Sequence, residues 1–171
     1  MKYVRATDDV KDMADRLRAK FSYDPTDGWL RRRTSYGKRC PAGAKVGYQS
    51  KIKHAEYWLV HFEGQNYLAH RLIWLYVHSE FPKDQLDHIN RIKTDNRLSN
   101  LRACSGYENT LNQAARGEYK NVSRVRASGR WRVQMRSFGI YHDMGTFESK
   151  ELAADFAWLA RRHLHGEFVH D

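Results

Sequence analysis

The sequence predicts an α+β protein built from two small domains, with residues 1–115 in the first and 116–171 in the second. The length of 171 residues suits one ordinary domain or two small ones. Helical periodicity near both ends flanks a region of short strands and turns, and the pattern changes again around AARGEY at 114–119. These observations favour a mixed fold with a seam after residue 115.

The composition favours a soluble protein that binds a polyanion. Lys and Arg number 30 against 20 Asp and Glu, which gives a formal net charge of +10. Such a charge favours nucleic acid through phosphate contacts and counterion release, and the alternative is a merely soluble basic protein. The longest apolar run, LIWLYV at 72–77, is too short to span a bilayer. We therefore expect a cytoplasmic protein without a membrane partner, in the host cytoplasm if it is phage-encoded.

The two cysteines, Cys40 and Cys104, lie far apart and form no CxxC pair. This spacing argues against a structural zinc site and against a disulfide framework. We expect two free thiols in a reducing compartment, although the count also allows one disulfide.

In the first domain, the pattern predicts an amphipathic helix over 7–20, with Val10, Met13 and Leu17 on one stripe. DPTDG at 24–28 then turns the chain, and residues 29–68 are typical of short strands and turns. AEYWLVHF, EGQN and YLAH together give the clearest hairpin. HRLIWLYVHSE at 70–80 predicts a buried helix, because it is apolar nearly all round.

In the second domain, residues 121–147 predict three strands separated by SG and FG turns. ESKELAADFAWLARRHLHG then predicts one helix, capped by Ser149 at its start and by Gly166 at its end. We expect its apolar stripe to pack on one face of the sheet. That stripe holds Leu152, Phe156, Leu159 and Leu164, with Ala153 and Ala160.

The strand RWRVQMR at 130–136 alternates apolar and polar residues. Because successive side chains of a strand point to opposite faces, its apolar residues should face the helix and its polar residues should form an outer face. We expect DNA contacts on that outer face, where Arg reads guanine and Gln reads adenine in a major groove. The alternative is a solvated polar face. The expected DNA-binding residues are Arg130, Arg132, Gln134 and Arg136, flanked by Arg124 and Arg126 of the preceding strand.

The order YKNV, GRWRVQMR, MGTF, AADFAWLARRHLHGE resembles the AP2/ERF DNA-binding domain over residues 117–169. The resemblance implies a three-stranded antiparallel sheet plus a helix, with the sheet in a major groove and strand Arg and Trp residues on bases and phosphates. Asn121 departs from the family, which prefers Gly at that position. The target sequence is therefore not carried over.

The stretch LDHINRIKTDNRLSN at 86–100 gathers polar side chains behind an apolar run. Hydrolysis of a phosphodiester needs a base that activates water, a cation that stabilises developing charge, and ligands that place the cation. Asp87 offers a hard oxygen ligand and His88 an imidazole. Asn96 and Asn100 could instead cap turns, which is the interpretation we favour for Asn96. A calcium loop is excluded, since Gly is missing from its sixth position.

The segment AHRLIWLYVHSEFPKDQLDHINRIKTDNRLSNLRACSGYENTLN resembles the HNH endonuclease family in its zinc-free H-N-N form, and with FSYDPTDGWLRRR the resemblance covers 21–112. It implies a ββα-metal fold. It implies His88 as general base, with Asp87 as one metal ligand. It also implies that Asn100 orients the base and its loop, and that Asn109 is the second metal ligand. Oxygen ligands of this kind favour Mg²⁺ or Mn²⁺.

The resemblance implies a homing-type endonuclease on double-stranded DNA. We also expect basic residues such as Arg97 and Arg102 to hold the DNA backbone near the active site. A monomer would nick, whereas a dimer could cut both strands. A catalytically inactive DNA-binding regulator and an RNA-binding or RNA-cleaving module are the alternatives. His70 is expected to be structural, with a phosphate contact as the rival role.

Overall fold

The computed structural model describes residues 7–52, 54–113 and 118–168 and divides into two compact units, residues 1–104 and 105–171. The expected seam after residue 115 lies outside the described residues. Both units combine helices with strands, as expected for an α+β protein.

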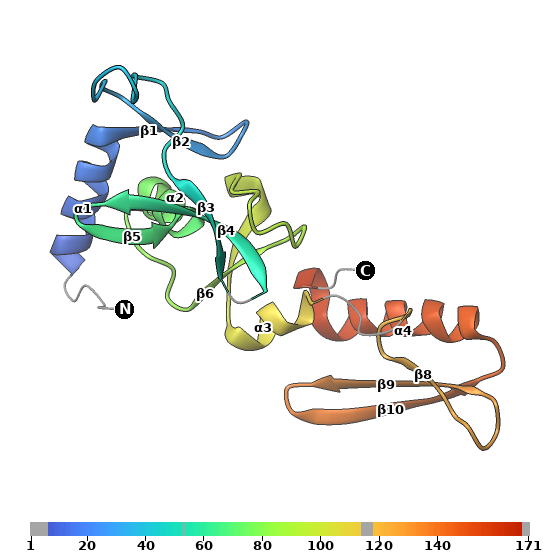
Figure 1. The fold of residues 1–171 in the computed structure, drawn as a ribbon. Helices are drawn as coiled ribbons and strands as arrows, with labels where there is room; N and C mark the ends of the chain where they lie inside the picture. The colour runs from blue at the N-terminus through green and yellow to red at the C-terminus, as the bar shows by residue number, and fades with distance from the viewer. Residues whose placement is uncertain (1–6, 53, 114–117, 169–171) are drawn as a thin grey trace. The chain divides into compact units, whose positions relative to one another are not determined.

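The first unit contains two antiparallel hairpins and one three-stranded antiparallel sheet of order β3-β4-β5. The predicted helix over 7–20 and the predicted hairpin after residue 55 are confirmed, although the hairpin turn is only Glu63 and Gly64. The elements are α1 (Thr7–Lys20), β1 (Phe21–Asp24), β2 (Trp29–Arg32), β3 (Tyr48–Ile52), β4 (Ala55–Phe62), β5 (Gln65–Leu68), α2 (Ala69–His78), β6 (Gln85–His88), the 3-10 turn η1 (Leu98–Asn100) and β7 (Leu101–Cys104) (Figure 1).

The core of the first unit forms where α1 and α2 meet β4. Met13 and Leu17 of α1 are buried in one cluster with Leu72 of α2 and Phe62 of β4. Leu101, the first residue of β7, belongs to the same cluster. The β6–β7 hairpin is therefore attached to the main core of the unit.

Helix α2 follows β5 without a loop and differs from the predicted range 70–80 by one residue at its start and two at its end. It ends because Ser79 adopts a left-handed conformation, with φ of 58°, and donates its N–H to the carbonyl of Leu75. This is a common way to satisfy the last carbonyls of a helix. The early start places His70 in the buried first turn.

The second unit packs one long helix on a three-stranded antiparallel sheet of order β10-β9-β8. The predicted order of three strands followed by a helix is confirmed. Ser149 caps the helix, since its hydroxyl accepts the N–H of Leu152 at 3.0 Å. The elements are α3 (Gly106–Leu111), β8 (Val122–Arg124), β9 (Trp131–Ser137), β10 (Ile140–Phe147), α4 (Lys150–His165) and the 3-10 turn η2 (Gly166–Phe168) (Figure 1).

The expected apolar stripe of α4 is correct for Ala153, Ala160 and Leu164 and wrong for its other three residues. The buried apolar residues are Ala153 and Ala157, which pack with Val133 and Met135 of β9. Small side chains let the helix approach the sheet closely, and the sheet supplies the bulk of the core. The large residues Leu152, Phe156 and Leu159 are exposed instead, and of the expected large residues only Leu164 packs on the core.

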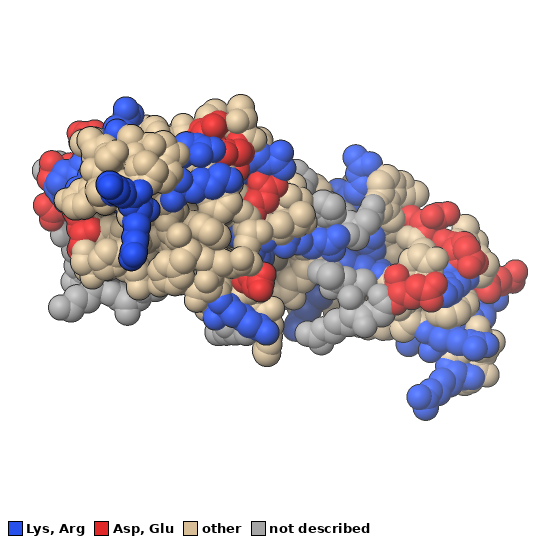
Figure 2. Space-filling view, turned by 45° about the horizontal axis from the view of Figure 1, so that its top comes forward, with Lys and Arg blue, Asp and Glu red and all other residues tan. Residues whose placement is uncertain are grey.

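Basic side chains are spread over the visible face of both units, interrupted by small groups of acidic residues (Figure 2). Among the described helices, none combines the length and the apolar character that a bilayer crossing requires.

Candidate functional site

The β6–β7 hairpin positions the two central residues of the candidate site. The antiparallel register pairs Asp87 with Arg102 and His88 with Leu101 at the end of β6. Directly after His88 the chain turns, since Arg91 donates its N–H to the carbonyl of His88 at 2.8 Å and has a φ of 64°. Asp87 and His88 are therefore the last two residues of β6, directly before the loop 89–97.

Asp87 is a fully buried carboxylate, 0% exposed, with cationic groups on both of its oxygens. Arg102 donates to Oδ2 from Nη2 at 2.9 Å and from Nε at 3.1 Å. The Nζ of Lys93 lies 3.7 Å from Oδ1. A charge at this depth requires such partners, because its removal from water is costly. The surroundings of Asp87 are thus built to hold positive charge against its oxygens.

His88 is buried as well, 1% exposed, and two neighbours fix its ring. Its Nε2 lies 3.3 Å from Oδ1 of Asn96. The ring of His70 stands edge-on to it, with the centroids 4.9 Å apart and an interplanar angle of 82°. If Oδ1 of Asn96 accepts the N–H of Nε2, the lone pair of the neutral ring lies on Nδ1.

Burial lowers the pKa of His88 to about 4, although the hydrogen bond to Asn96 opposes this effect. Burial, with a smaller contribution from His88, lowers the pKa of His70 to about 3. Both imidazoles are therefore neutral at physiological pH. A neutral imidazole is the form that can accept a proton.

Asn100 closes the loop that follows His88. Its side-chain Oδ1 accepts the N–H of Asn90 at 2.9 Å, and its Nδ2 donates to the carbonyl of Asp95 at 2.9 Å. Its own carbonyl accepts the N–H of Ile89 at 2.9 Å. These contacts hold the loop together, and the predicted role of Asn100 in orienting the base stays a prediction.

A second network stiffens the same loop around Asp95. Arg97 binds this carboxylate from Nε at 2.8 Å and from Nη2 at 2.6 Å, and Asn90 donates to it at 2.8 Å. The side-chain hydrogen bond from Arg97 is the main reason that the pKa of Asp95 falls to about 2. Asp95 is thus ionised throughout the neutral range and organises the loop.

The β1–β2 hairpin hydrogen-bonds to the C-terminal end of the loop, at Asn96 and Leu98. The hydroxyl of Tyr23 accepts the N–H of Leu98 at 2.8 Å and donates to the carbonyl of Asn96 at 3.4 Å. Gly28, with a φ of 74°, lies so close that an added Cβ would stand 2.5 Å from the backbone N of Arg97. The hairpin that carries DPTDG therefore supports the segment that presents Asn96 to His88.

The structure brings together three of the predicted site residues, Asp87, His88 and Asn100. Asn109 lies half-buried on α3, in the second unit, so its role as a metal ligand stays a prediction from the family resemblance. Arg97 and Arg102, expected near DNA, are bound to acids of the protein itself.

Three residues contact Asp87 or His88 although the sequence did not predict these contacts. Asn96, expected to cap a turn, is 2% exposed and contacts His88. Lys93 faces Asp87, and His70 packs on His88. The preference for a structural His70 agrees with its burial. No local pattern identifies these contacts, because each depends on how the loop folds back over the core.

The strand β9 alternates as predicted, with Val133 and Met135 buried against α4. Arg132, Gln134 and Arg136 lie on the opposite face of the strand, and Tyr141 shares that face as the cross-strand partner of Arg136. This outer face is less uniformly basic than expected. Asp143 lies 3.9 Å from Arg132 and 3.5 Å from Gln134, and Glu148 lies 3.5 Å from Arg130.

Arg124 does not lie on the expected face. The register pairs it with Trp131, and cross-strand partners point to the same side of a sheet. Its guanidinium carbon stands 6.0 Å from the ring centroid of Trp131. Ser123 shares the outer face with Arg132 instead, and Arg126 lies in the turn after β8.

The carboxylate of Asp87 is the donor of the candidate site whose chemistry suits a hard divalent cation, and cationic side chains occupy it in this structure. Within the described ranges, no three His, Cys, Asp or Glu side chains gather closely enough to hold a metal, so a site built from such side chains is not formed there. A carboxylate oxygen is the donor that Mg²⁺ and Mn²⁺ prefer, usually with several waters retained. Arg102 and Lys93 already pair with Asp87, so a divalent cation would have to displace at least one of them from a carboxylate oxygen.

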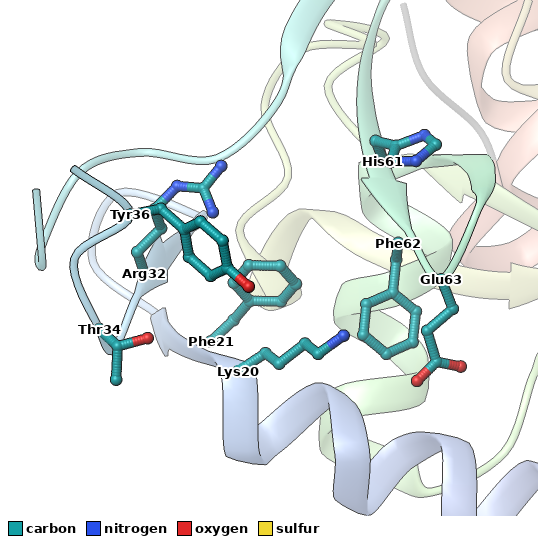
Figure 3. A pocket seen from close by; sticks show the side chains of 8 residues that line it. All are labelled: Lys20, Phe21, Arg32, Thr34, Tyr36, His61, Phe62 and Glu63. Carbon is teal, nitrogen blue, oxygen red and sulfur yellow. The ribbon is translucent and has the colours of Figure 1, made fainter. Parts of the chain in front are cut away.

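A separate pocket in the first unit lies beside α1 and the β1–β2 hairpin (Figure 3). Lys20 extends over the ring of Phe62, 5.3 Å from its centroid, and Glu63 is paired with Arg16 at 2.8 Å. None of the candidate site residues lines it. The lining residues are Lys20, Phe21, Arg32, Thr34, Tyr36, His61, Phe62 and Glu63.

Comparison with known proteins assigns a family to the segment that holds this site. Residues 67–111 match the HNH endonuclease family. An uncharacterized HNH endonuclease of Acanthamoeba polyphaga mimivirus is 30% identical over 102 residues. That alignment covers 58% of this chain and 54% of the viral protein, so the chain spans about half the length of this HNH relative. No solved structure matches the chain.

The HNH match contains Asp87, His88, Asn96, Asn100 and Asn109. The name of the viral relative agrees with the family of the matched segment. The match ends before the sheet of the second unit, so the AP2/ERF resemblance remains a prediction.

Proposed function

We propose that this protein is a metal-dependent DNA endonuclease of the homing type, which hydrolyses phosphodiester bonds by nicking or at preferred sites. The observation that carries the proposal is the buried pair Asp87 and His88 at the end of β6, inside the HNH match. A buried carboxylate beside a neutral imidazole is costly to maintain and has a clear use in hydrolysis.

His88 acts as the general base. Its ring is neutral because burial lowers its pKa to about 4, and Asn96 fixes the orientation of Nε2. A water that hydrogen-bonds to the unprotonated nitrogen of this ring can therefore lose a proton to it as the water oxygen attacks phosphorus. Asn100 keeps the loop closed around the base during this step.

Asp87 supplies the oxygen ligand of the divalent ion, and Asn109 is proposed as the second ligand on the basis of the HNH resemblance alone. A bound Mg²⁺ or Mn²⁺ would stabilise negative charge on the phosphate and on the leaving oxygen. Arg102 and Lys93 hold the carboxylate in place in this structure, and the ion would replace one of these contacts.

The outer face of the β8–β10 sheet is proposed to bind duplex DNA in the manner of AP2/ERF domains. Arg132, Gln134 and Arg136 supply the contacts from β9, with Arg130 beside them. Arg124 and Arg126 would reach the phosphates from the sheet edge and the adjoining turn. Arg97 remains exposed enough to reach a phosphate while it holds Asp95.

The test is the cleavage of supercoiled plasmid with Mg²⁺ by the wild type, by His88→Ala and by His54→Ala, an exposed histidine of the first unit. His88→Ala is expected to bind the plasmid normally. Its nicking rate should fall by about 10²–10⁴-fold, which is the usual contribution of a general base. The His54→Ala variant should nick like the wild type. Undiminished nicking by His88→Ala would exclude His88 as the base.

A catalytically inactive DNA-binding regulator is the second candidate, because Arg102 and Lys93 already neutralise Asp87. In such a protein Asp87 would stay paired with Arg102 and Lys93, and no metal ion would replace them. The regulator binds DNA equally with Mg²⁺ and with EDTA and nicks under neither condition. Metal-dependent nicking that Asp87→Asn abolishes would exclude it.

A further inference from the structure

Helix α4 presents large apolar side chains to solvent. Leu152 is 55% exposed, Phe156 39% and Leu159 59%, although each belongs to a residue type that is usually buried. They follow one another at intervals of four and three residues, so they form one stripe along the helix, and His163 continues it. A contiguous exposed apolar stripe of this kind marks an interaction surface.

Leu152 and Leu159 of the stripe take no part in the core cluster of the second unit. Ala153 and Ala157 bury the other side of α4 against Val133 and Met135 of β9. Phe156 also touches the sheet, through the ring of Phe147 at 4.9 Å. Apolar residues that alternate at intervals of four and three are typical of the contact line between two paired helices, parallel or antiparallel. Another helix is therefore the element that fits this surface.

The charges beside the stripe indicate which helix this is. Asp155 and Arg162 lie on the same flank, one near each end of the stripe, and both are exposed. They are separated by seven residues, about 10.5 Å along the helix axis at 1.5 Å per residue. Within one copy this spacing keeps them apart. In an antiparallel arrangement of two copies, the acid of each lies beside the base of the other.

We propose that α4 pairs antiparallel with α4 of a second copy of this chain. The interface is isologous, as in twofold symmetric dimers, so every contact occurs twice. Phe156 packs against Leu159 of the second copy, Leu152 against His163, and Asp155 forms an ion pair with Arg162. This pairing aligns the two apolar seams and both charge pairs in a single register.

The dimer leaves the proposed DNA-binding face open. Arg132 and Arg136 lie on the face of β9 that points away from α4. If the proposed nuclease activity holds, one assembly carries two copies of the site and is able to cut both strands. The dimer itself does not depend on that activity.

The first experiment is sedimentation velocity of the full chain over a concentration series, without DNA or metal. The wild type is expected to change from monomer to dimer. Leu159→Glu is expected to raise the dimer dissociation constant at least tenfold. Ile92→Glu, at an apolar residue of similar exposure in the first unit, should dimerise like the wild type. A wild type that stays monomeric throughout, or equal effects of both variants, would overturn the proposal.

The second experiment exchanges the charges. Asp155→Arg alone and Arg162→Asp alone place like charges opposite each other, so each is expected to weaken the dimer at least tenfold. The double variant has the same net charge as the wild type and should recover dimerisation. Circular dichroism checks that all variants fold. If the double variant fails to recover while it is folded, the antiparallel register is wrong. A wild type that dimerises but does not nick plasmid would count against the proposed function and leave the dimer untouched.

Discussion

Arg102 of β7 binds Asp87 of β6 from two donors, Nη2 at 2.9 Å and Nε at 3.1 Å, and both reach the same oxygen of a fully buried carboxylate. The pair joins the two strands of the hairpin at the point where the candidate site begins. Its energetic role differs from that of the surface pairs of this protein, because the carboxylate of Asp87 is buried and has no access to solvating water in the folded hairpin.

We expect Arg102→Met to destabilise the protein by about 3–5 kcal/mol, since it removes the guanidinium that lies closer than Lys93 to a buried charge. Urea unfolding measures this change. Asp87→Asn combined with Arg102→Met should recover most of the loss. The control is Arg16→Met, which breaks a partly exposed pair with Glu63 and should cost far less, because water solvates both partners. Equal losses in both single variants would contradict a special role for the buried pair.

Acid is expected to destabilise the fold through two histidines. Burial lowers the pKa of His70 to about 3 and that of His88 to about 4, whereas the unfolded chain titrates its histidines near 6.5. Between these values the unfolded state binds more protons. The stability conferred by the neutral rings is thus complete above pH 6.5 and is lost as the pH falls towards 3.

Each ring is expected to contribute a slope of about 1.4 kcal/mol per pH unit between pH 4 and 6.5. Urea unfolding at several pH values should show that His70→Phe removes about half of the slope. His54→Gln, at an exposed position, should leave it unchanged. A wild-type stability that does not vary over this range would refute the burial of neutral rings.

Asn96 is expected to matter for catalysis rather than for DNA binding. Asn96→Ala removes the oxygen that faces Nε2 of His88, so the ring loses its fixed orientation. We expect kcat for plasmid nicking to fall about 10–100-fold, as is typical when a partner that orients a functional histidine is removed. Asn66→Ala disrupts a similar but exposed contact, to Nδ1 of His61 at 3.0 Å, and should have no effect.

Gly28→Ala should disturb the site from a distance. Its Cβ would lie 2.5 Å from the backbone N of Arg97 and 2.7 Å from the carbonyl carbon of Asn96. Gly37→Ala has the same backbone strain, with a φ of 75°, but meets nothing within 4 Å. The left-handed conformation alone costs about 1–2 kcal/mol. We expect Gly28→Ala to cost more than Gly37→Ala in urea and to reduce nicking, which Gly37→Ala should not do.

The outer face of the second unit is expected to contribute to DNA affinity. Arg132→Ala and Arg136→Ala should each weaken binding. Each phosphate that a variant no longer neutralises should make the slope of log K against log salt shallower by about 0.9. Fluorescence anisotropy at several salt concentrations measures both quantities. Arg39→Ala, at an exposed loop position of the first unit, is the matched control. Unchanged slopes for all three variants would place the DNA elsewhere.

The part of the site that could be predicted from the sequence is its local part. Asp87, His88 and Asn100 lie within fourteen positions of one another, and a hairpin and its loop bring them together. Asn96 was misinterpreted because a loop Asn that caps a turn and one that faces a buried ring look alike in sequence. His70 comes from another helix, and its contact with His88 depends on the packing of α2.

In the second unit, the sequence likewise did not reveal which face of α4 and of β8 is buried. Periodicity along α4 yields a stripe of large residues and an adjacent stripe of alanines, and the sequence does not say which of the two meets the sheet. Alternation along β9 correctly separated its two faces. It could not place Arg124, because the face of β8 depends on the register between strands, which pairs Arg124 with Trp131.

The hydroxyl of Tyr23 ties the β1–β2 hairpin to the backbone at Leu98, more than seventy positions later. The segment that matches the HNH family begins only at residue 67. A fragment trimmed to that match would keep Asp87 and His88 yet lose the support on which Asn96 rests. If the proposed nuclease activity holds, the smallest fragment that keeps this support has to start at or before Phe21, and grafts or split versions should be designed with that boundary.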